Sequence, residues 1–330
     1  MTLDEIEELA RRALEGAGAS ETQAASVARS TRRAEADGIR SHGLMYVPIY
    51  AEHVRGGKVI GDAEPTVERT RPGAIRVDAK HGFAHPAIDR GWDAFTAAAR
   101  ENGVAAMTVH NSYNCGVLGH HAERLAEDGL VGLCFTHAPA SIAPTGGSTP
   151  VVGTNPFALA VPDGEGGAAF VIDQSASAVA KSEIILRSKS GEPIAEGWAL
   201  DADGKPTTDA AAALKGTMVP AGGTKGFNVG LTVEVLASCL AGAVLSNEAS
   251  PFSGPVGGPP ATGQCFVAFD PEAFAGAAFR TQISKLVGAI EAQDGARLPG
   301  SRKRLNRERI ARDGVEVDSA LRERIEAYAA

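Results

Sequence analysis

The chain has 330 residues, of which 44% are hydrophobic and 22% charged, so it can bury a substantial core and is not predicted to be disordered. A formal net charge of −8 gives no electrostatic support for nucleic-acid binding. Residues 229–246 carry Glu234 and are not a transmembrane segment, and the acidic N-terminus does not resemble a signal peptide. We therefore expect a cytoplasmic protein that binds neither nucleic acid nor membrane.

Two helices are predicted at the start of the chain. Thr2 with Glu5, and Ser20 with Gln23, have the spacing of capping boxes. Apolar residues recur at helical spacing after the first cap. A third helix is expected soon after, with Pro48 tolerated only in its first turn.

From residue 74 onward, apolar segments of strand and helix length alternate. Strands are predicted at 74–79, 104–110, 130–136, 157–162, 169–173 and 264–270. Helices are predicted at 86–103, 117–128, 225–246, 271–293 and 318–328. The pattern indicates an α/β chain with helical N- and C-terminal regions. The basic segment 302–312 is interpreted as the solvated face of a helix.

The four cysteines are widely spaced and form no CxxC pair. Neither a disulfide framework nor a metal site is therefore predicted. Cys134, Cys239 and Cys265 lie in apolar runs, so each is expected to be a small buried hydrophobic side chain.

The triplet Ser41-His42-Gly43 is the first candidate for chemistry. Histidine can exchange a proton near neutral pH, a neighbouring serine can orient its ring, and glycine leaves room for a ligand. Alone, the triplet is common and carries little weight. His53, a few residues later, is interpreted as an exposed helix residue.

Stretches rich in glycine and polar residues occupy 110–121, 143–162, 171–181 and 220–230. The chain has no G-x-G-x-x-G, no P-loop and no G-x-S-x-G, so these stretches fit none of the common nucleotide or hydrolase motifs. Lys225, within a glycine-rich helix start, suits a phosphate. These residues also have interpretations that involve no ligand. The glycines can form turns, Asp173 can cap a helix, and Lys225 can be a solvated surface residue.

Taken in order, the segments ADGIRSHG, APTGG…GTNP, VIDQSAS, GWALDADGKPTTD, GGTKG and RLPGSR resemble the malate/L-lactate dehydrogenase family. This family is distinct from the Rossmann lactate and malate dehydrogenases, and it includes sulfolactate and ureidoglycolate dehydrogenases and reductases of Δ1-piperideine- and Δ1-pyrroline-2-carboxylate. The resemblance implies a non-Rossmann NAD(P)-binding fold of the L-sulfolactate dehydrogenase-like type, which accounts for the missing fingerprint. It also implies a homodimer.

The resemblance assigns roles to individual residues. His42 is the expected proton donor or acceptor, with Ser41 orienting its ring or touching the substrate. The residues expected to bind NAD(H) or NADP(H) are Thr154, Asn155, Asp173, Ser175, Ser177, Thr224, Lys225, Pro299 and Gly300. Residues 73–270 are expected to form the NAD(P)-binding α/β domain. Residues 1–72 together with 271–330 are expected to form a helical region for substrate binding and dimerisation.

The sequence departs from the family pattern in the substrate pocket. Tyr46 stands where many members carry an arginine that pairs with the substrate carboxylate, and Asn114 replaces a histidine. A third departure from the family pattern starts at Lys181. Residues 181–183 are Lys-Ser-Glu, where relatives often have Arg-Gly-Lys. Either another cation, Arg40 or Lys181, binds the carboxylate, or hydroxyl and amide groups such as those of Tyr46 and Asn114 recognise the substrate.

The resemblance therefore predicts an NAD(P)-dependent oxidoreductase that transfers hydride to or from C2 of a small 2-oxo acid, 2-hydroxy acid or cyclic 2-imino acid. The motifs do not separate these substrates or NAD from NADP. A degenerate, non-catalytic NAD(P)-binding member is the alternative, which the changes at Tyr46 and Asn114 leave open.

Overall fold

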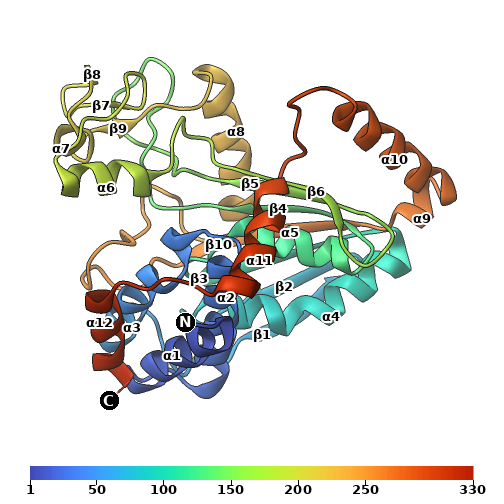
Figure 1. Cartoon of the computed structure of the whole chain (residues 1–330), viewed down its shortest axis with the longest axis horizontal. Helices are drawn as coiled ribbons and strands as arrows, with labels where there is room; N and C mark the ends of the chain where they lie inside the picture. The colour runs from blue at the N-terminus through green and yellow to red at the C-terminus, as the bar shows by residue number, and fades with distance from the viewer. Residues whose placement is uncertain (330) are drawn as a thin grey trace.

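The two ends of the chain pack together as helices. The structure, a computed structural model, describes residues 1–329. Figure 1 shows both termini in the same layer of helices. The helices of this layer are α1 (Leu3–Gly16), α2 (Glu21–Ala36), α3 (Val47–Arg55) and α12 (Ser319–Ala329). They share a core of apolar side chains that includes Ile6, Leu44 and Ile325.

The predicted helix starts are largely confirmed. Thr2 and Glu5 form a complete capping box, and Pro48 lies in the first turn of α3. Ser20 caps α2 by accepting from the Gln23 N–H, but the Gln23 side chain turns away to the Ala63 carbonyl. The second capping box is therefore only half formed.

A seven-stranded sheet crosses the middle of the molecule in the order β1-β2-β3-β10-β4-β5-β6. Its strands are β1 (Thr66–Arg71), β2 (Ala74–Asp78), β3 (Val104–Ser112), β4 (Val131–Thr136), β5 (Phe157–Pro162), β6 (Ala168–Gln174) and β10 (Thr262–Phe269). Only β2 and β3 pair in parallel; every other neighbouring pair in this sheet is antiparallel. A Rossmann sheet is mostly parallel, so the predicted non-Rossmann architecture is confirmed.

Helices cover both faces of this sheet. On one face, α4 (Ala84–Asn102) and α5 (Leu118–Glu127) bury side chains such as Ile88 and Leu125 against the strands (Figure 1). On the other face, α8 (Thr224–Glu234) and the π-helical turn η3 (Val235–Cys239) pack against Phe135 and Cys265. Gly103, at φ +78°, ends α4 as the sequence predicts.

A second, three-stranded sheet lies beside the first and was not predicted. Its strands are β7 (Ala199–Leu200), β8 (Pro206–Thr207) and β9 (Thr217–Met218), and it packs with α6 (Lys181–Ser190) and α7 (Ala210–Ala213). The predicted helix over 225–246 is too long, because α8 passes into η3 and ends near Leu240. Cys239, in that turn, is exposed, so its predicted burial is wrong.

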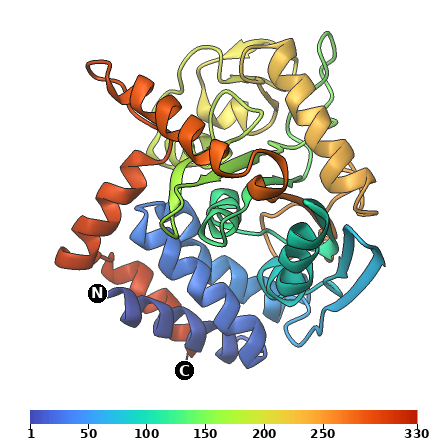
Figure 2. The same cartoon turned by 90° about the vertical axis from the view of Figure 1, so that its right-hand side faces the viewer.

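The C-terminal part of the chain leaves the sheet and returns to it. The predicted helix over 271–293 is divided into α9 (Pro271–Phe274) and α10 (Ala277–Glu291) by Gly276, at φ +53°. Figure 1 shows α10 projecting from the body of the protein, and in Figure 2 the same helix, in orange, crosses the side that faces the viewer. The basic segment then forms α11 (Ser301–Asp313), which lies against α2.

The boundary predicted at residue 72 is not where the sheet begins. Strand β1 pairs antiparallel with β2, so residues 66–71 belong to the sheet and not to the helical region. Among residues 1–329, no helix is both long and apolar enough to cross a membrane.

Candidate active site

A buried carboxylate shapes the Ser41-His42-Gly43 turn. The segment forms two short 3₁₀ turns, η1 (Arg40–His42) and η2 (Leu44–Tyr46). Glu35, at the end of α2, accepts a 2.7 Å hydrogen bond from the Leu44 N–H. A Cβ added to Gly43 would lie 2.1 Å from Glu35 Oε1. Gly43 therefore makes room for Glu35, and not for a ligand as its sequence context suggested.

His42 lies in this turn with its ring oriented by a neighbour. Ser41 Oγ is 3.1 Å from His42 Nδ1, which leaves Nε2 as the ring nitrogen available for proton exchange. Burial lowers the pKa of His42, while the negative charge of Asp173 acts in the opposite direction. The imidazole is thus electrostatically coupled to a carboxylate on another element.

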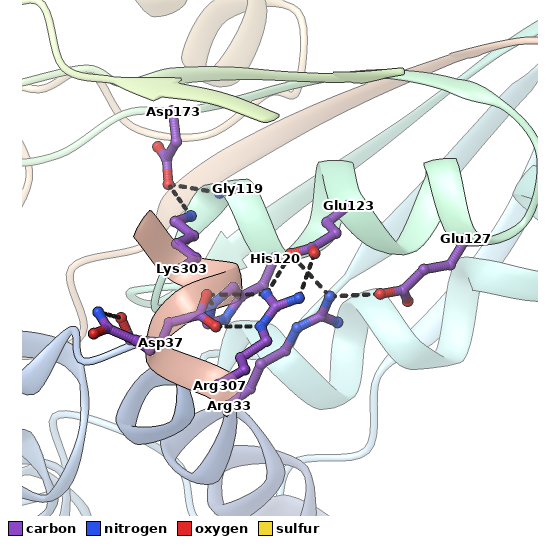
Figure 3. A network of polar contacts seen from close by, with 10 residues as sticks. Arg33, Asp37, Gly119, His120, Glu123, Glu127, Asp173, Lys303 and Arg307 are labelled. Atoms are coloured by element: carbon purple, nitrogen blue, oxygen red, sulfur yellow. Dashed lines mark hydrogen bonds and ion pairs between the residues drawn. The ribbon is translucent and has the colours of Figure 1, made fainter. Parts of the chain in front are cut away.

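Asp173 lies at the end of β6, where the N-terminus of α5 meets it. The Gly119 N–H donates to Asp173 Oδ2 at 2.9 Å, and Lys303 Nζ lies 3.8 Å from the same oxygen (Figure 3). A Cβ on Gly119 would lie 2.6 Å from Oδ2, so glycine is required for this approach. Asp173, predicted as a cofactor residue, is also the carboxylate whose charge opposes the lowering of the His42 pKa.

Lys303 is a residue of the site that the sequence analysis missed. Its Nζ is buried and, within the described chain, has no hydrogen-bond partner. Such an ammonium group is costly to bury unless an anion compensates it, and Asp173 at 3.8 Å does so only in part. Its place just after the RLPGSR motif was the signal that could have identified it.

A network of ion pairs holds α11, and with it Lys303, in place (Figure 3). Arg307 donates to both carboxylate oxygens of Asp37, whose side chain is fully buried, and to Glu123 on α5. His120 Nε2, also on α5, lies 3.0 Å from Asp37. These contacts join α2, α5 and α11 behind the Asp173 carboxylate.

The predicted cofactor residues at 154, 175, 177, 224 and 225 lie on three neighbouring segments. The Ala176 N–H donates to the Thr154 carbonyl and the Ala221 N–H to the Ala176 carbonyl, both at 2.8 Å. Ser175 and Ser177 are joined through their hydroxyls at 2.9 Å. The structure thus brings together three stretches that lie far apart in the sequence.

Residues 224 and 225 open helix α8 at the edge of this group. Thr224 is joined to Thr145 by their hydroxyls at 3.2 Å, and Lys225 is exposed in the first turn. Gly222 and Gly223 adopt positive φ values of +68° and +64° immediately before the helix. Gly223, the N-cap of α8, has no side chain to cap the first N–H groups of the helix, and such a helix start is suited to an anion.

Pro299 and Gly300 lie against strand β6. The Pro299 carbonyl accepts from the Val171 N–H at 3.2 Å, and Gly300, at φ +86°, packs on Val171. A side chain at Gly300 would be both strained and crowded there. These residues connect the end of β6 to the start of α11.

Asn155 has a structural role in addition to its predicted one. It is fully buried, and its side-chain amide donates to the Gly230 carbonyl and to Glu234 while its Oδ1 accepts from Ala138 N–H. Both side-chain N–H donors are therefore used within the protein. Asn155 thus ties the GTNP loop to α8.

Of the predicted substrate residues, Tyr46 and Asn114 lie near each other, whereas Arg40 does not share their buried setting. The half-buried Tyr46 ring lies parallel to that of His42, with centroids 6.4 Å apart. Asn114 is nearby, with Oδ1 accepting from the Gly116 N–H at 2.6 Å, and burial raises the pKa of Tyr46 to about 12. Arg40 shares the turn of His42 but is exposed at the surface.

His53, interpreted from the sequence as exposed, is completely buried. Its Nδ1 lies 2.5 Å from the Tyr113 hydroxyl, and the Tyr113 ring contacts Tyr50 edge-on. Within residues 1–329, no group of three or more His, Cys, Asp or Glu side chains is arranged to hold a metal ion.

Comparison with known proteins places this geometry in a family. The model of the family described as malate/L-lactate dehydrogenase matches residues 1–326. The (2R)-3-sulfolactate dehydrogenase (NADP(+)) of Chromohalobacter salexigens is 44% identical, covering 100% of this chain and 98% of the relative. The Δ1-pyrroline-2-carboxylate reductase of Ancylobacter novellus is 42% identical, covering 97% and 95% respectively.

A solved structure supports the same assignment. The crystal structure of Δ1-piperideine-2-carboxylate reductase from Pseudomonas syringae pvar. tomato matches with a TM-score of 0.94 and 32% identity over 99% of each chain. The resemblance inferred from the motifs is therefore confirmed along the whole chain. The protein belongs to the malate/L-lactate dehydrogenase family, and it is an oxidoreductase of that family's non-Rossmann fold.

Proposed function

We propose that this protein is an NAD(P)-dependent oxidoreductase that acts at C2 of a small 2-oxo or 2-hydroxy acid, or of a cyclic 2-imino acid. The observation that carries the proposal is the match to the malate/L-lactate dehydrogenase family over residues 1–326, together with the His42 ring that Ser41 holds at 3.1 Å. The carboxylate of Asp173, whose charge favours the His42 imidazolium, ends β6 at the start of the segment that we propose binds a dinucleotide. The relatives' names include both hydroxyacid and imino acid enzymes, at 44% and 42% identity.

The residues present suit a dinucleotide. The first N–H groups of α8, with Thr224 and Lys225, would hold a phosphate or pyrophosphate. The buried, unpartnered ammonium of Lys303 would compensate a further anionic group, from the cofactor or from the substrate. Thr154, Ser175 and Ser177 would supply hydroxyl and backbone contacts between these points. When bound, the nicotinamide supplies or accepts the hydride.

His42 would exchange the proton that accompanies the hydride. In reduction, protonated His42 donates to the substrate oxygen or nitrogen at C2, and in oxidation the neutral ring removes that proton. Ser41, at 3.1 Å from Nδ1, keeps Nε2 directed at the substrate. Asp173 stabilises the imidazolium, which burial alone would disfavour.

A substrate panel tests this function directly. Absorbance at 340 nm would follow NADH and NADPH with 2-oxo acids, 2-hydroxy acids and cyclic imines as substrates. The proposal predicts turnover of at least one class with at least one cofactor. NAD(P)H binding, seen by fluorescence titration, without turnover of any panel member would favour the non-catalytic alternative.

We also propose that the protein acts as a homodimer, as the family resemblance implies. Within the single described chain, none of the 15 residues of α10 is buried. Two large apolar side chains there are exposed, Phe274 in α9 and Leu286 in α10. Sedimentation equilibrium should give twice the monomer mass. A Leu286→Asp variant should shift this toward the monomer, whereas a wild-type monomer would contradict the proposal.

A further inference from the structure

The turn that carries His42 has no buried side chain of its own. None of the residues of η1 (Arg40–His42) is buried, so packing does not fix this turn from within. Leu44, just after it, differs, because its side chain is 1% exposed and packs in the core of the helical layer. The position of His42 therefore depends on what holds the chain before and after the turn.

A single residue holds both sides of this turn. The main-chain carbonyl of Glu35 accepts from the Gly38 N–H at 2.9 Å, just before the turn. The Glu35 side chain reaches past the turn, where Oε1 accepts from the Leu44 N–H at 2.7 Å. Glu35 lies in the last turn of α2 and is 3% exposed. The segment from Gly38 to Leu44 is thus a loop that closes on one buried residue of a helix.

Gly43 is the joint between the two short turns. It separates η1 from η2, with φ −92° and ψ −143°. If Gly43 carried a Cβ, the three heavy atoms nearest to it would all belong to the Glu35 side chain, the furthest of them at 2.9 Å. The φ is negative, so the approach of Glu35, and not a left-handed backbone, is what requires glycine here. The carboxylate therefore lies directly against the joint.

The joint determines how His42 lies relative to the candidate substrate residue Tyr46. His42 precedes Gly43 and Tyr46 follows it, and the two rings are nearly parallel, at 7°, with centroids 6.4 Å apart. A rotation at the joint would change this arrangement and the direction of His42 Nε2. Proton transfer requires the donor within hydrogen-bond reach of the substrate atom, so even a small displacement of the ring is costly.

The carboxylate of Glu35 occupies a setting that does not favour its charge. Burial raises the pKa of Glu35, because it disfavours the ionised form. The hydrogen bond from the Leu44 N–H offsets part of the cost of burying this group. A glutamine at this position could accept the same hydrogen bond without a charge. The Glu35→Gln substitution therefore separates the effect of position from the effect of charge.

From this geometry we infer that Glu35 is a positioning residue for proton transfer, which holds His42 in place through the Leu44 N–H and the Gly43 joint. The hydrogen bond, and not the negative charge, is the part of Glu35 that matters. The inference rests on the proposed function for its kinetic consequence, but the closure of the loop on Glu35 can be measured without any turnover.

Hydrogen exchange is the first test, and it needs no substrate. In the full chain, mass spectrometry of peptides that cover residues 38–46 would follow amide exchange in the wild type and in variants. Glu35→Ala should speed exchange in this segment by about tenfold or more, since the loop is released. Glu35→Gln should exchange as the wild type does. Unchanged exchange in Glu35→Ala would overturn the inference even if the enzyme is active.

Turnover is the second test. Glu35→Ala should lower kcat for the best panel substrate by about tenfold to a hundredfold, with the dissociation constant for NAD(P)H unchanged. Its solvent deuterium isotope effect on kcat should exceed that of the wild type, because proton transfer from a displaced His42 becomes slower than the other steps. Partial unfolding lowers the apparent kcat but leaves the isotope effect unchanged. An isotope effect equal to that of the wild type would therefore contradict positioning.

The conservative variant shows which property of the side chain acts. Glu35→Gln should keep kcat within about threefold of the wild type, because the amide oxygen still accepts from the Leu44 N–H. A loss in Glu35→Gln equal to that in Glu35→Ala would assign the effect to charge and overturn the inference. Glu35→Met keeps the buried volume but has no oxygen acceptor, so it takes the place of Glu35→Ala in both tests if that variant does not fold.

Gly43 allows a test of coupling between the two residues. Gly43→Ala places a methyl group against Glu35 and should lower kcat by about tenfold or more. In the double variant with Glu35→Ala, the methyl group enters the space that the carboxylate leaves, so kcat should be no lower than in Glu35→Ala alone. Independent effects would multiply, and a double variant that loses activity in that way would overturn the inference.

Gln23 provides a matched control at the other end of α2. It is completely buried, and its side chain hydrogen bonds with main-chain groups of Ala63 and Phe83. Gln23→Ala should lower the stability of the protein without raising the isotope effect. An equal rise in Gln23→Ala and Glu35→Ala would contradict a role specific to the His42 loop. If the wild-type protein turns over no panel member, the proposed function fails, and hydrogen exchange alone decides the inference.

Discussion

At the scale of residues, the pKa of His42 is the balance of two opposing effects. Burial disfavours the imidazolium and lowers the pKa, whereas the carboxylate of Asp173 favours it. Ser41 fixes the ring but adds no charge. Asp173 is therefore the charged group whose removal should move the pH profile.

Replacing Asp173 by asparagine tests this balance. The amide oxygen of Asn can still accept from the Gly119 N–H, so the variant removes charge and little else. Reduction needs protonated His42, and its rate falls as pH rises through the His42 pKa. Without the carboxylate that pKa falls, so the profile of kcat/KM for reduction should move to lower pH. The oxidation profile should extend to lower pH by the same amount.

The exposed Asp203 provides a control, since Asp203→Asn changes net charge equally at a distance from the site. It should leave both profiles in place. An Asp173→Asn profile that coincides with that of the wild type would show that the two groups are not coupled in the working enzyme.

The sequence predicted the location of the site better than the roles of its residues. The motifs located His42 and the cofactor segments, because they depend on local backbone geometry. They could not show that Asn155 hydrogen bonds with Gly230 and Glu234, or that the charge of Asp173 acts on His42, because these interactions join residues distant in sequence. The burial of His53 follows from the aromatic cluster around Tyr113 and was equally invisible.

At the scale of elements, helix α11 depends on Arg307 for its position. Asp37 is fully buried, and Arg307 is its cationic partner on α11 (Figure 3). The pKa of Asp37 is held well below its ordinary value by His120 and Arg307. A carboxylate in this setting is expensive to leave without its partner.

Arg307→Met should therefore destabilise the protein markedly. We expect the free energy of unfolding to fall by about 2–3 kcal/mol in urea, less than for a fully enclosed pair because Arg307 is 34% exposed. Arg322→Met breaks an exposed i,i+4 pair with Glu326 and serves as the matched control, with an expected loss of about 0.5 kcal/mol or less. Equal effects of the two substitutions would contradict the structural role of this network.

Most long elements were predicted and most short ones were not. Strands such as β3 and β5 and helices such as α4 carry strong apolar patterns, and all three are confirmed. Strand β1 is largely exposed and has a polar sequence, so it has no such pattern. Strands β7, β8 and β9 have two residues each, too few for any periodicity.

At the scale of the whole molecule, the order of strands follows from contacts that no local pattern encodes. Strand β10 inserts between β3 and β4 although it comes much later in the chain. The alternation of strands and helices indicated the fold class, and the family resemblance indicated the topology. Behind this sheet, three histidines are enclosed as neutral groups, and they make the stability of the fold sensitive to pH.

Burial lowers the pKa of His85 to about 3 and those of His120 and His121 to about 4. In the unfolded chain these groups titrate near their ordinary value of 6.5, so between those values the unfolded state binds more protons. The free energy of unfolding should therefore decrease as pH falls from about 6.5 toward 4, by roughly 2 kcal/mol per histidine at pH 5.

Urea unfolding at pH 7 and pH 5 measures this loss. His121→Asn can retain a donor to the Cys115 carbonyl while removing one titrating group. The free energy of unfolding of this variant should therefore fall less between pH 7 and pH 5 than that of the wild type. Identical stability of the wild-type protein at both pH values would show that these histidines are not held neutral.

The measurement that tests the central claim most directly is the turnover of a His42→Asn variant with its cofactor affinity. Asn can keep a hydrogen bond to Ser41 but cannot exchange a proton near neutral pH. We predict that kcat for the best panel substrate falls by about 100-fold or more, the usual contribution of a general acid or base. The dissociation constant for NAD(P)H, from fluorescence titration, should stay near that of the wild type. A kcat close to the wild-type value, with the cofactor still bound, would contradict the assignment of His42.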